Sequence, residues 1–244
     1  MNYVLKIAYD GTAYHGWQRQ KNGITVQEVM ESTLEKLLGA PTAVTGCSRT
    51  DAGVHARIYV CNFHGETTIP EEKLPIVLNM YLPPDIRVYD CKLADEDFNA
   101  RFSAHGKIYE YKILNRAYAD PIQRNFVWHY PIKLDVEKMR LAAAAMRGKR
   151  DFACFCAAGS RVKSTVRNLY ELSVHKDGDI ITVRAGADGF LYNMVRIITG
   201  TLVYVGNGKL TVDEVSELMK KGDRRLAGIT APPQGLALTE VFYE

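Results

Sequence analysis

The chain has 244 residues, long enough for one large domain or two small ones, and a core of this size needs no disulfide or metal to stabilise it. Hydrophobic residues make up 47% and charged residues 24% of the sequence, a balance that excludes a disordered chain. No apolar run approaches the ~20 residues that span a bilayer, the N-terminus lacks a signal-peptide pattern, and the net charge of +3 indicates no partner by itself.

The first half of the chain begins with a predicted strand and a predicted helix. Apolar residues alternate over 3–9, as in a half-buried strand. Over 26–37 they recur at intervals of three and four, Thr25 with Glu28 fits a capping box, and Gly39 marks the end of the helix. The other elements predicted in this half are strands over 44–47, 57–63 and 86–93 and a short helix that opens at Pro70.

The second half has the same alternation of strands and helices. Asp135 is expected to cap an alanine-rich helix that ends at Gly148. The run 177–179, Asp-Gly-Asp, predicts a hairpin between two strands. A long apolar helix is predicted over 190–205 and a shorter one over 212–220. The strands predicted here are 107–114, 126–130, 166–175, 180–187 and 236–242.

Together these elements predict an α+β protein with mainly antiparallel sheets flanked by helices. Because the element pattern recurs, we expect two similar halves. The predicted domains are an N-terminal α+β domain over 1–103 and a C-terminal α+β domain over 104–244.

Basic residues gather in two segments that also carry aromatic side chains. Each segment contains one acid, Asp151 in the first and Glu110 in the second. A single basic run is typical of a solvated surface. Cations that neutralise phosphates, mixed with rings that stack on bases, favour a nucleic-acid surface. The basic residues are Arg147, Lys149, Arg150, Arg161, Lys163 and Arg167 in the first segment and Arg101, Lys107, Lys112 and Arg116 in the second.

The loop 46–56, between two predicted strands, concentrates chemically active side chains. Its pattern is also typical of a structural turn, in which Asp51 accepts backbone hydrogen bonds beside a glycine with positive φ. Asp51, His55 and His64 could instead be metal ligands. That set is incomplete, and Gly53 argues against the helix that would align Asp51 with His55.

The run GCSRTDAGVHA over 46–56 closely resembles the signature of the tRNA pseudouridine synthase A family, in which the loop aspartate is catalytic. Ser48 departs from the glycine usual in relatives, which affects the loop conformation rather than the chemistry. The resemblance covers almost the whole chain. It continues through the runs YDGT, GWQRQ, FNARFSA, KIYEY, KSTVR, FLYNMVRIITG and APPQGL.

The resemblance implies the pseudouridine synthase fold, with a central cleft, and the isomerisation of uridine to pseudouridine at positions 38, 39 and 40 of the tRNA anticodon stem-loop. The reaction gains and loses no atom, so we expect no cofactor and no metal. The resemblance also implies a homodimer in which one tRNA contacts both subunits. The five cysteines lack metal-site spacing, which favours reduced thiols and a cytoplasmic protein without membrane attachment.

The resemblance also implies roles for individual residues. Asp51 matches the catalytic aspartate, as nucleophile or base, and Arg196 matches the arginine that pairs with it, although helical spacing by itself also allows a solvated Arg196. Arg49 is expected to fill the space that a flipped nucleotide vacates. Tyr109 is expected to pack against the target base, whereas strand alternation alone would make Tyr109 and Tyr111 core residues. The basic residues expected to bind the substrate are Arg101, Lys163 and Arg167.

Two alternatives to the isomerase stay open at this point. A tRNA-binding chaperone of the same fold would bind RNA without catalysis, but the joint presence of Asp51, Tyr109 and Arg196 counts against it. A metal-dependent phosphohydrolase built on Asp51, His55 and His64 would lose all activity in EDTA.

Overall fold

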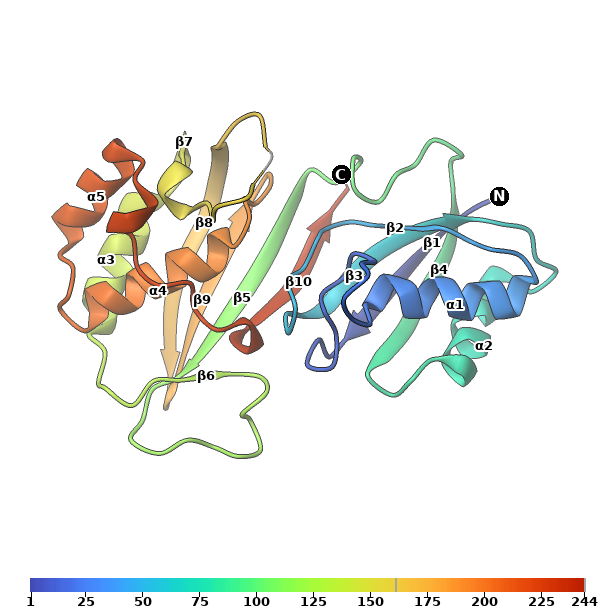
Figure 1. Ribbon diagram of the computed structural model, residues 1–244, viewed down its shortest axis with the longest axis horizontal. Helices are drawn as coiled ribbons and strands as arrows, with labels where there is room; N and C mark the ends of the chain where they lie inside the picture. Colours follow the sequence, from blue (N-terminus) through green and yellow to red (C-terminus); the bar gives the residue numbers. More distant parts are fainter. Residues whose placement is uncertain (161, 244) are drawn as a thin grey trace. The chain divides into compact units, whose positions relative to one another are not determined.

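The computed structural model describes residues 1–160 and 162–243, so Arg161 of the first basic segment lies outside the described residues. The chain divides into two compact units (Figure 1). Unit 1 contains Met1–His105 together with the segment from Ala237 onward, and unit 2 contains Gly106–Leu236. Both units combine a mainly antiparallel sheet with helices, which confirms the predicted α+β class.

The sheet of unit 1 is built around β1 (Asn2–Tyr9), which lies antiparallel to β3 (His55–His64) on one side and to β4 (Ile86–Ala94) on the other. β2 (Val44–Gly46) extends this sheet by pairing with β3. The last strand, β10 (Leu236–Phe242), joins it in parallel, with Ala237 and Leu238 opposite His55 and Ala56.

The helices of unit 1 follow the signals in the sequence. α1 (Val26–Leu38) begins after Thr25, whose side chain accepts a hydrogen bond from the N–H of Glu28, and it ends at Gly39 with a left-handed φ of 73°. α2 (Leu74–Tyr81) follows a short 3₁₀ turn that Pro70 opens, as predicted.

In unit 2, β5 (Gly106–Leu114) and β8 (Val166–Asp177) lie antiparallel on either side of β9 (Ile180–Ala187), and β7 (Gly148–Asp151) extends the sheet next to β8. The predicted hairpin at Gly178 joins β8 to β9. The helices α3 (Val136–Met146), α4 (Met194–Gly206) and α5 (Val212–Lys221) lie together on one side of this sheet (Figure 1). Among the described residues, no helix is both long enough and apolar enough to cross a membrane.

Three predicted boundaries in unit 2 are wrong. α4 begins at Met194 rather than at residue 190, because Asn193 has a left-handed φ of 60° that no α-helix continues through. The predicted strand 126–130 is reduced to the two residues of β6 (Trp128–His129), because the N–H of Phe126 is used in a turn. α3 ends at Met146, and Gly148 already belongs to β7.

Candidate active site

Asp51 opens a tight turn in the loop that joins β2 to β3. The N–H of Val54 donates to the carbonyl oxygen of Asp51 at 3.1 Å, and Gly53 between them has a left-handed φ of 77°. Asp51 is half-buried. The turn therefore fixes the backbone from which the carboxylate projects.

The residues on both sides of Asp51 are held by the segment that follows β1. The N–H of Trp17 donates to the carbonyl oxygen of Thr50 at 3.2 Å, and the N–H of Gly53 donates to that of Tyr14 at 3.2 Å. The side chain of Thr50 is buried and shares a hydrogen bond of 2.9 Å with the hydroxyl of Tyr9. Asp51 is thus flanked by neighbours with little freedom to move.

Two glycines allow the segment that follows β1 to approach the Asp51 loop closely. A Cβ atom on Gly16 would overlap the carbonyl oxygen of Thr50, and its φ of 84° already disfavours other residues. A Cβ atom on Gly11 would overlap the carbonyl oxygen of Val54. The runs YDGT and GWQRQ therefore have a physical role in seating the Asp51 loop.

An aromatic cluster lies beneath the entry to the loop. The rings of Trp17 and Tyr59 stack with centroids 4.1 Å apart, and Tyr9 contacts Tyr59 at 5.5 Å. The hydroxyl of Tyr59 donates to the carbonyl oxygen of Ser48. Because complete burial raises the pKa of Tyr59 well above its ordinary value, this group stays a neutral donor.

His55 supports the loop from behind rather than forming a metal site with His64. Its Nδ1 accepts a hydrogen bond of 2.9 Å from the N–H of Gly11 and lies 3.1 Å from the carboxylate of Asp10. His64 is at the opposite end of the ten-residue strand β3, about 30 Å away. The two histidines cannot bind one ion, so the alternative of an Asp51–His55–His64 metal site is wrong. Over residues 1–160 and 162–243, no group of three His, Cys, Asp or Glu side chains could hold a metal ion.

In unit 2, Arg196 lies in the first turn of α4 and its guanidinium is held from two directions. Nε donates to the carbonyl oxygen of Ala231 at 2.7 Å, and Nη1 donates to the side-chain oxygen of Asn193 at 2.8 Å. Arg196 is half-buried. It is therefore an anchored cation, which excludes the alternative of a freely solvated helix arginine.

The two tyrosines of β5 are both buried. The hydroxyl of Tyr111 donates to the carbonyl oxygen of Pro232 at 2.6 Å, and burial raises its pKa, which confirms Tyr111 as a core residue. The ring of Tyr109 meets Phe190 edge-on, with centroids 5.1 Å apart. Packing alone makes Tyr109 a core residue as well, so its contact with a base stays a prediction.

The segment 231–235 supports both Arg196 and Tyr111, a role that the sequence did not predict. Two consecutive carbonyl groups in it, those of Ala231 and Pro232, accept hydrogen bonds from Arg196 and Tyr111. The run Pro232-Pro233 is the signal that could have suggested this, because prolines fix the backbone and supply acceptors without donors.

The candidate residues are divided between the two units. Arg49 and Arg101 are exposed in unit 1, where the guanidinium of Arg101 lies 5.4 Å from the Phe102 ring. In unit 2, Lys163 is exposed, and Arg167 is half-buried with Nη1 donating to backbone carbonyl groups nearby. Unit 1 thus contains Asp51, Arg49 and Arg101, and unit 2 contains Tyr109, Arg196, Lys163 and Arg167.

Comparison with known proteins gives consistent similarities along the chain. A family model described as tRNA pseudouridine synthase matches residues 6–103 and 142–244. These ranges include every candidate residue above except Tyr109. A protein named tRNA pseudouridine synthase A from Thermoanaerobacter sp. (strain X514) is 50% identical over 242 residues, covering 99% of each chain. Proteins of the same name from Ruminiclostridium cellulolyticum and Clostridium acetobutylicum are 48% and 46% identical, covering 98% and 99% of each chain.

Proposed function

This chain belongs to the tRNA pseudouridine synthase A family and is an isomerase that acts on tRNA, and we propose that Asp51 is its catalytic carboxylate. We also propose that the enzyme modifies uridines 38, 39 and 40 of the anticodon stem-loop. The observation that carries the proposal is the rigid seat of Asp51, with a backbone turn at Val54 and a hydrogen bond from Trp17 to Thr50. A carboxylate on a fixed backbone can be aimed at one atom of a substrate without reorganisation.

The isomerisation breaks the bond between C1′ and N1 of uridine and joins C1′ to C5. The proton on C5 is lost and N1 gains one, so the composition of the nucleoside is unchanged. Asp51 can act as a nucleophile toward the nucleotide or as the base that removes the C5 proton. Both roles require the ionised carboxylate, which a nearby cation favours.

We propose Arg196 as that cation. Hydrogen bonds to Ala231 and Asn193 already hold its guanidinium, so its charge can be presented in one direction at little entropic cost. The sequence match supports the pairing with Asp51, which predicts that Arg196→Lys retains tRNA binding and loses most of kcat, because an ammonium cannot reproduce the planar fork of donors.

The remaining roles concern the flipped nucleotide. Arg49, which is exposed and lies two residues before Asp51 in the chain, is proposed to fill the space that an extruded base leaves. Tyr109 is proposed to pack against the uracil. Phosphate contacts are proposed for Arg101, Lys163 and Arg167.

The proposed assembly is a cytoplasmic homodimer that binds one tRNA across both subunits. The cysteines support this compartment, because none of the five, all of which lie within the described residues, forms a disulfide. Sedimentation equilibrium tests the dimer: a mass of one chain at the concentration of the assay would contradict it.

Mapping pseudouridine in tRNA transcripts, after incubation with protein and no additive, tests the proposed function. Wild-type protein should modify the anticodon stem-loop, and Asp51→Asn should bind tRNA normally and form no pseudouridine. Asp97→Asn, at an exposed aspartate of unit 1, is the matched control and should behave as wild type. Normal modification by Asp51→Asn would refute the role of Asp51. Wild-type binding without any product would support the chaperone alternative.

A further inference from the structure

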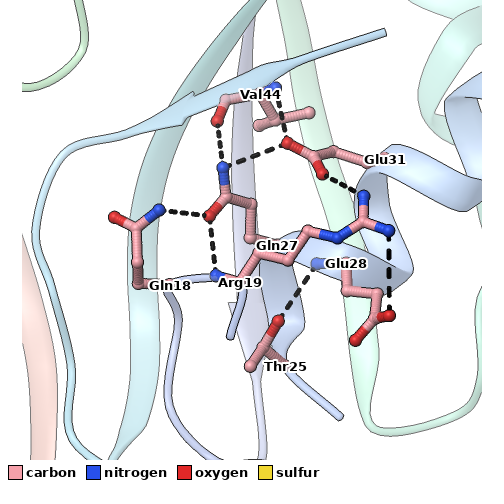
Figure 2. Close-up of polar contacts among 7 residues, drawn as sticks. All are labelled: Gln18, Arg19, Thr25, Gln27, Glu28, Glu31 and Val44. Atoms are coloured by element: carbon pink, nitrogen blue, oxygen red, sulfur yellow. Dashed lines mark hydrogen bonds and ion pairs between the residues drawn. The ribbon is translucent and has the colours of Figure 1, made fainter. Parts of the chain in front are cut away.

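Gln27 and Glu31, one helical turn apart on α1, both bind the backbone of Val44 at the start of β2 (Figure 2). Nε2 of Gln27 donates to the carbonyl oxygen of Val44 at 2.9 Å, and Oε1 of Glu31 accepts the N–H of Val44 at 3.2 Å. In an antiparallel ladder both groups of one residue point to the same side. The two side chains therefore take the place of a neighbouring strand on the edge of β2.

The same two side chains also hold the segment that contains Arg19. Oε1 of Gln27 accepts the backbone N–H of Arg19 and the side-chain amide of Gln18, each at 2.9 Å (Figure 2). Oε2 of Glu31 accepts Nη1 of Arg19 at 3.1 Å. The backbone N–H of Gln27 donates to the carbonyl oxygen of Trp17 at 3.0 Å.

These two held segments are the ones that seat Asp51. β2, which begins at Val44, leads into the Asp51 loop, and the N–H of Trp17 donates to Thr50, the residue before Asp51. One glutamine and one glutamate thus fix the entry to the loop and its main backbone support. A short series of hydrogen bonds thus connects each of these side chains to a residue near Asp51 in the chain.

The positive charge of Arg19 is paired with two carboxylates of α1. Its side chain is 58% exposed, as a phosphate-binding cation would be, but its guanidinium faces Glu31 at 3.1 Å and Glu28 at 3.9 Å. Glu31 is only 14% exposed, which strengthens its interaction with Arg19 relative to a fully solvated pair. The two carboxylates offset the attraction that Arg19 would have for RNA.

We infer that Gln27 and Glu31 are positioning residues for the Asp51 loop, with Arg19 as their ionic partner. The inference rests on the proposed catalytic role of Asp51. It requires that changes at Gln27 and Glu31 act on kcat and leave tRNA binding unchanged.

The variant Glu31→Gln tests this most directly. It retains the size of the side chain and an acceptor for Val44, and it removes the charge that faces Arg19. We expect kcat to fall about tenfold, in the range typical of groups that orient a reacting residue, with KM and Kd for tRNA within about twofold of wild type. Glu35→Gln is the matched control, since Glu35 is exposed one turn further along the same helix. It should behave as wild type.

A second variant keeps the test decisive if Glu31→Gln folds poorly. Gln27→Met retains the length of the side chain and removes all of its hydrogen bonds. In a Trp128→Phe background the emission reports Trp17 alone, which is buried, so loosening of its segment should shift that emission to the red. We expect the shift together with the fall in kcat, measured well below the melting temperature.

Wild-type kcat in both variants would overturn the inference. A rise in KM with unchanged kcat would also overturn it, because Arg19 and its partners would then serve tRNA binding. If wild-type protein forms no pseudouridine, the proposed function fails instead. The Trp17 emission of Gln27→Met then still decides whether this pair holds the segment.

Discussion

Arg196 and Ala231 are joined by two hydrogen bonds that run in opposite directions. Nε of Arg196 donates to the carbonyl oxygen of Ala231 at 2.7 Å, and the N–H of Ala231 donates to the carbonyl oxygen of Arg196 at 3.1 Å. Both the side chain and the backbone of the arginine are therefore tied to one residue. The direction of the guanidinium is set by this tie and by Asn193, which makes Asn193 the natural place to test it.

Substitutions of Asn193 separate its backbone role from its side-chain role. Asn193→Gly tolerates the φ of 60° but loses the hydrogen bond to Arg196, so kcat should fall several-fold with nearly unchanged stability. Asn193→Ala loses the same bond and adds strain, so the free energy of unfolding should fall further, by about 1–2 kcal/mol. Steady-state kinetics and urea unfolding measure the two effects. Full activity in Asn193→Gly would show that this hydrogen bond does not orient Arg196.

Gly16→Ala should disrupt the seat of Asp51. The added methyl group would overlap the carbonyl oxygen of Thr50 at a residue with φ of 84°, so we expect a loss of at least about 2 kcal/mol in unfolding free energy and nearly complete loss of activity. Gly39→Ala is the matched control, because Gly39 has φ of 73° and, its own neighbours along the chain aside, no atom of the described residues lies within 4 Å of the place that its Cβ would take. It should lose about 1 kcal/mol of stability and keep its kcat. Equal activities of the two variants would contradict the close-approach argument.

Thiol reactivity should be confined to one cysteine in the folded protein. Burial raises the pKa of Cys91 and of Cys154 to about 12, so neither forms thiolate at pH 8. Cys156 is half-buried and should react first with a thiol reagent. Five thiols should react in guanidinium. Rapid reaction of all five under native conditions would contradict the prediction.

The same thiols predict a loss of stability in alkali. In the unfolded chain a cysteine releases its proton near pH 8.5, whereas Cys91 and Cys154 hold theirs to about pH 12 when folded. Above pH 8.5 the unfolded state therefore binds fewer protons than the folded state, and the free energy of unfolding falls as pH rises toward 12. Urea unfolding at pH 8, 9 and 10 measures this. A free energy that rises over this interval would contradict it.

The salt dependence of tRNA binding should distinguish exposed cations that contact phosphate from those already paired. Lys163→Ala should reduce the slope of log Kd against log salt by about 1. Arg225→Ala is the control, because Asp223 holds the Arg225 guanidinium with hydrogen bonds that lower the pKa of the carboxyl to about 2. Its slope should equal that of wild type. Equal slopes in both variants would contradict the proposed contact between Lys163 and a tRNA phosphate.

Elements whose ends are marked by local signals were predicted well from sequence. Thr25 and Gly39 delimit α1 because capping and left-handed glycine act within one turn of the helix. The start of α4 was not predicted, because apolar periodicity is unchanged through the turn at Asn193. What stops the helix there is the backbone of Asn193, whose side chain is used by Arg196.

The sequence motif that contains Asp51 was enough to select it as the candidate catalytic residue. The residues that hold the Asp51 loop in place could not be predicted from the sequence. Gln27 and Glu31 resemble the solvated face of an amphipathic helix in the sequence, and only the fold brings Val44 and Arg19 to them. Tertiary contacts between polar side chains leave no periodic pattern. Residues proposed to orient a catalytic group are consequently harder to predict from sequence than the proposed catalytic residue itself.

The parallel pairing of β10 with β3 has a consequence for synthesis of the protein. Unit 1 is completed by Ala237 and Leu238, and by Tyr243, whose hydroxyl donates to the carbonyl oxygen of Ala100 at 2.8 Å. These residues leave the ribosome only after the whole of unit 2. A nascent chain that ends before these residues thus carries Asp51 on a sheet that lacks β10, so the sheet of unit 1 can be completed only after unit 2 has been synthesised.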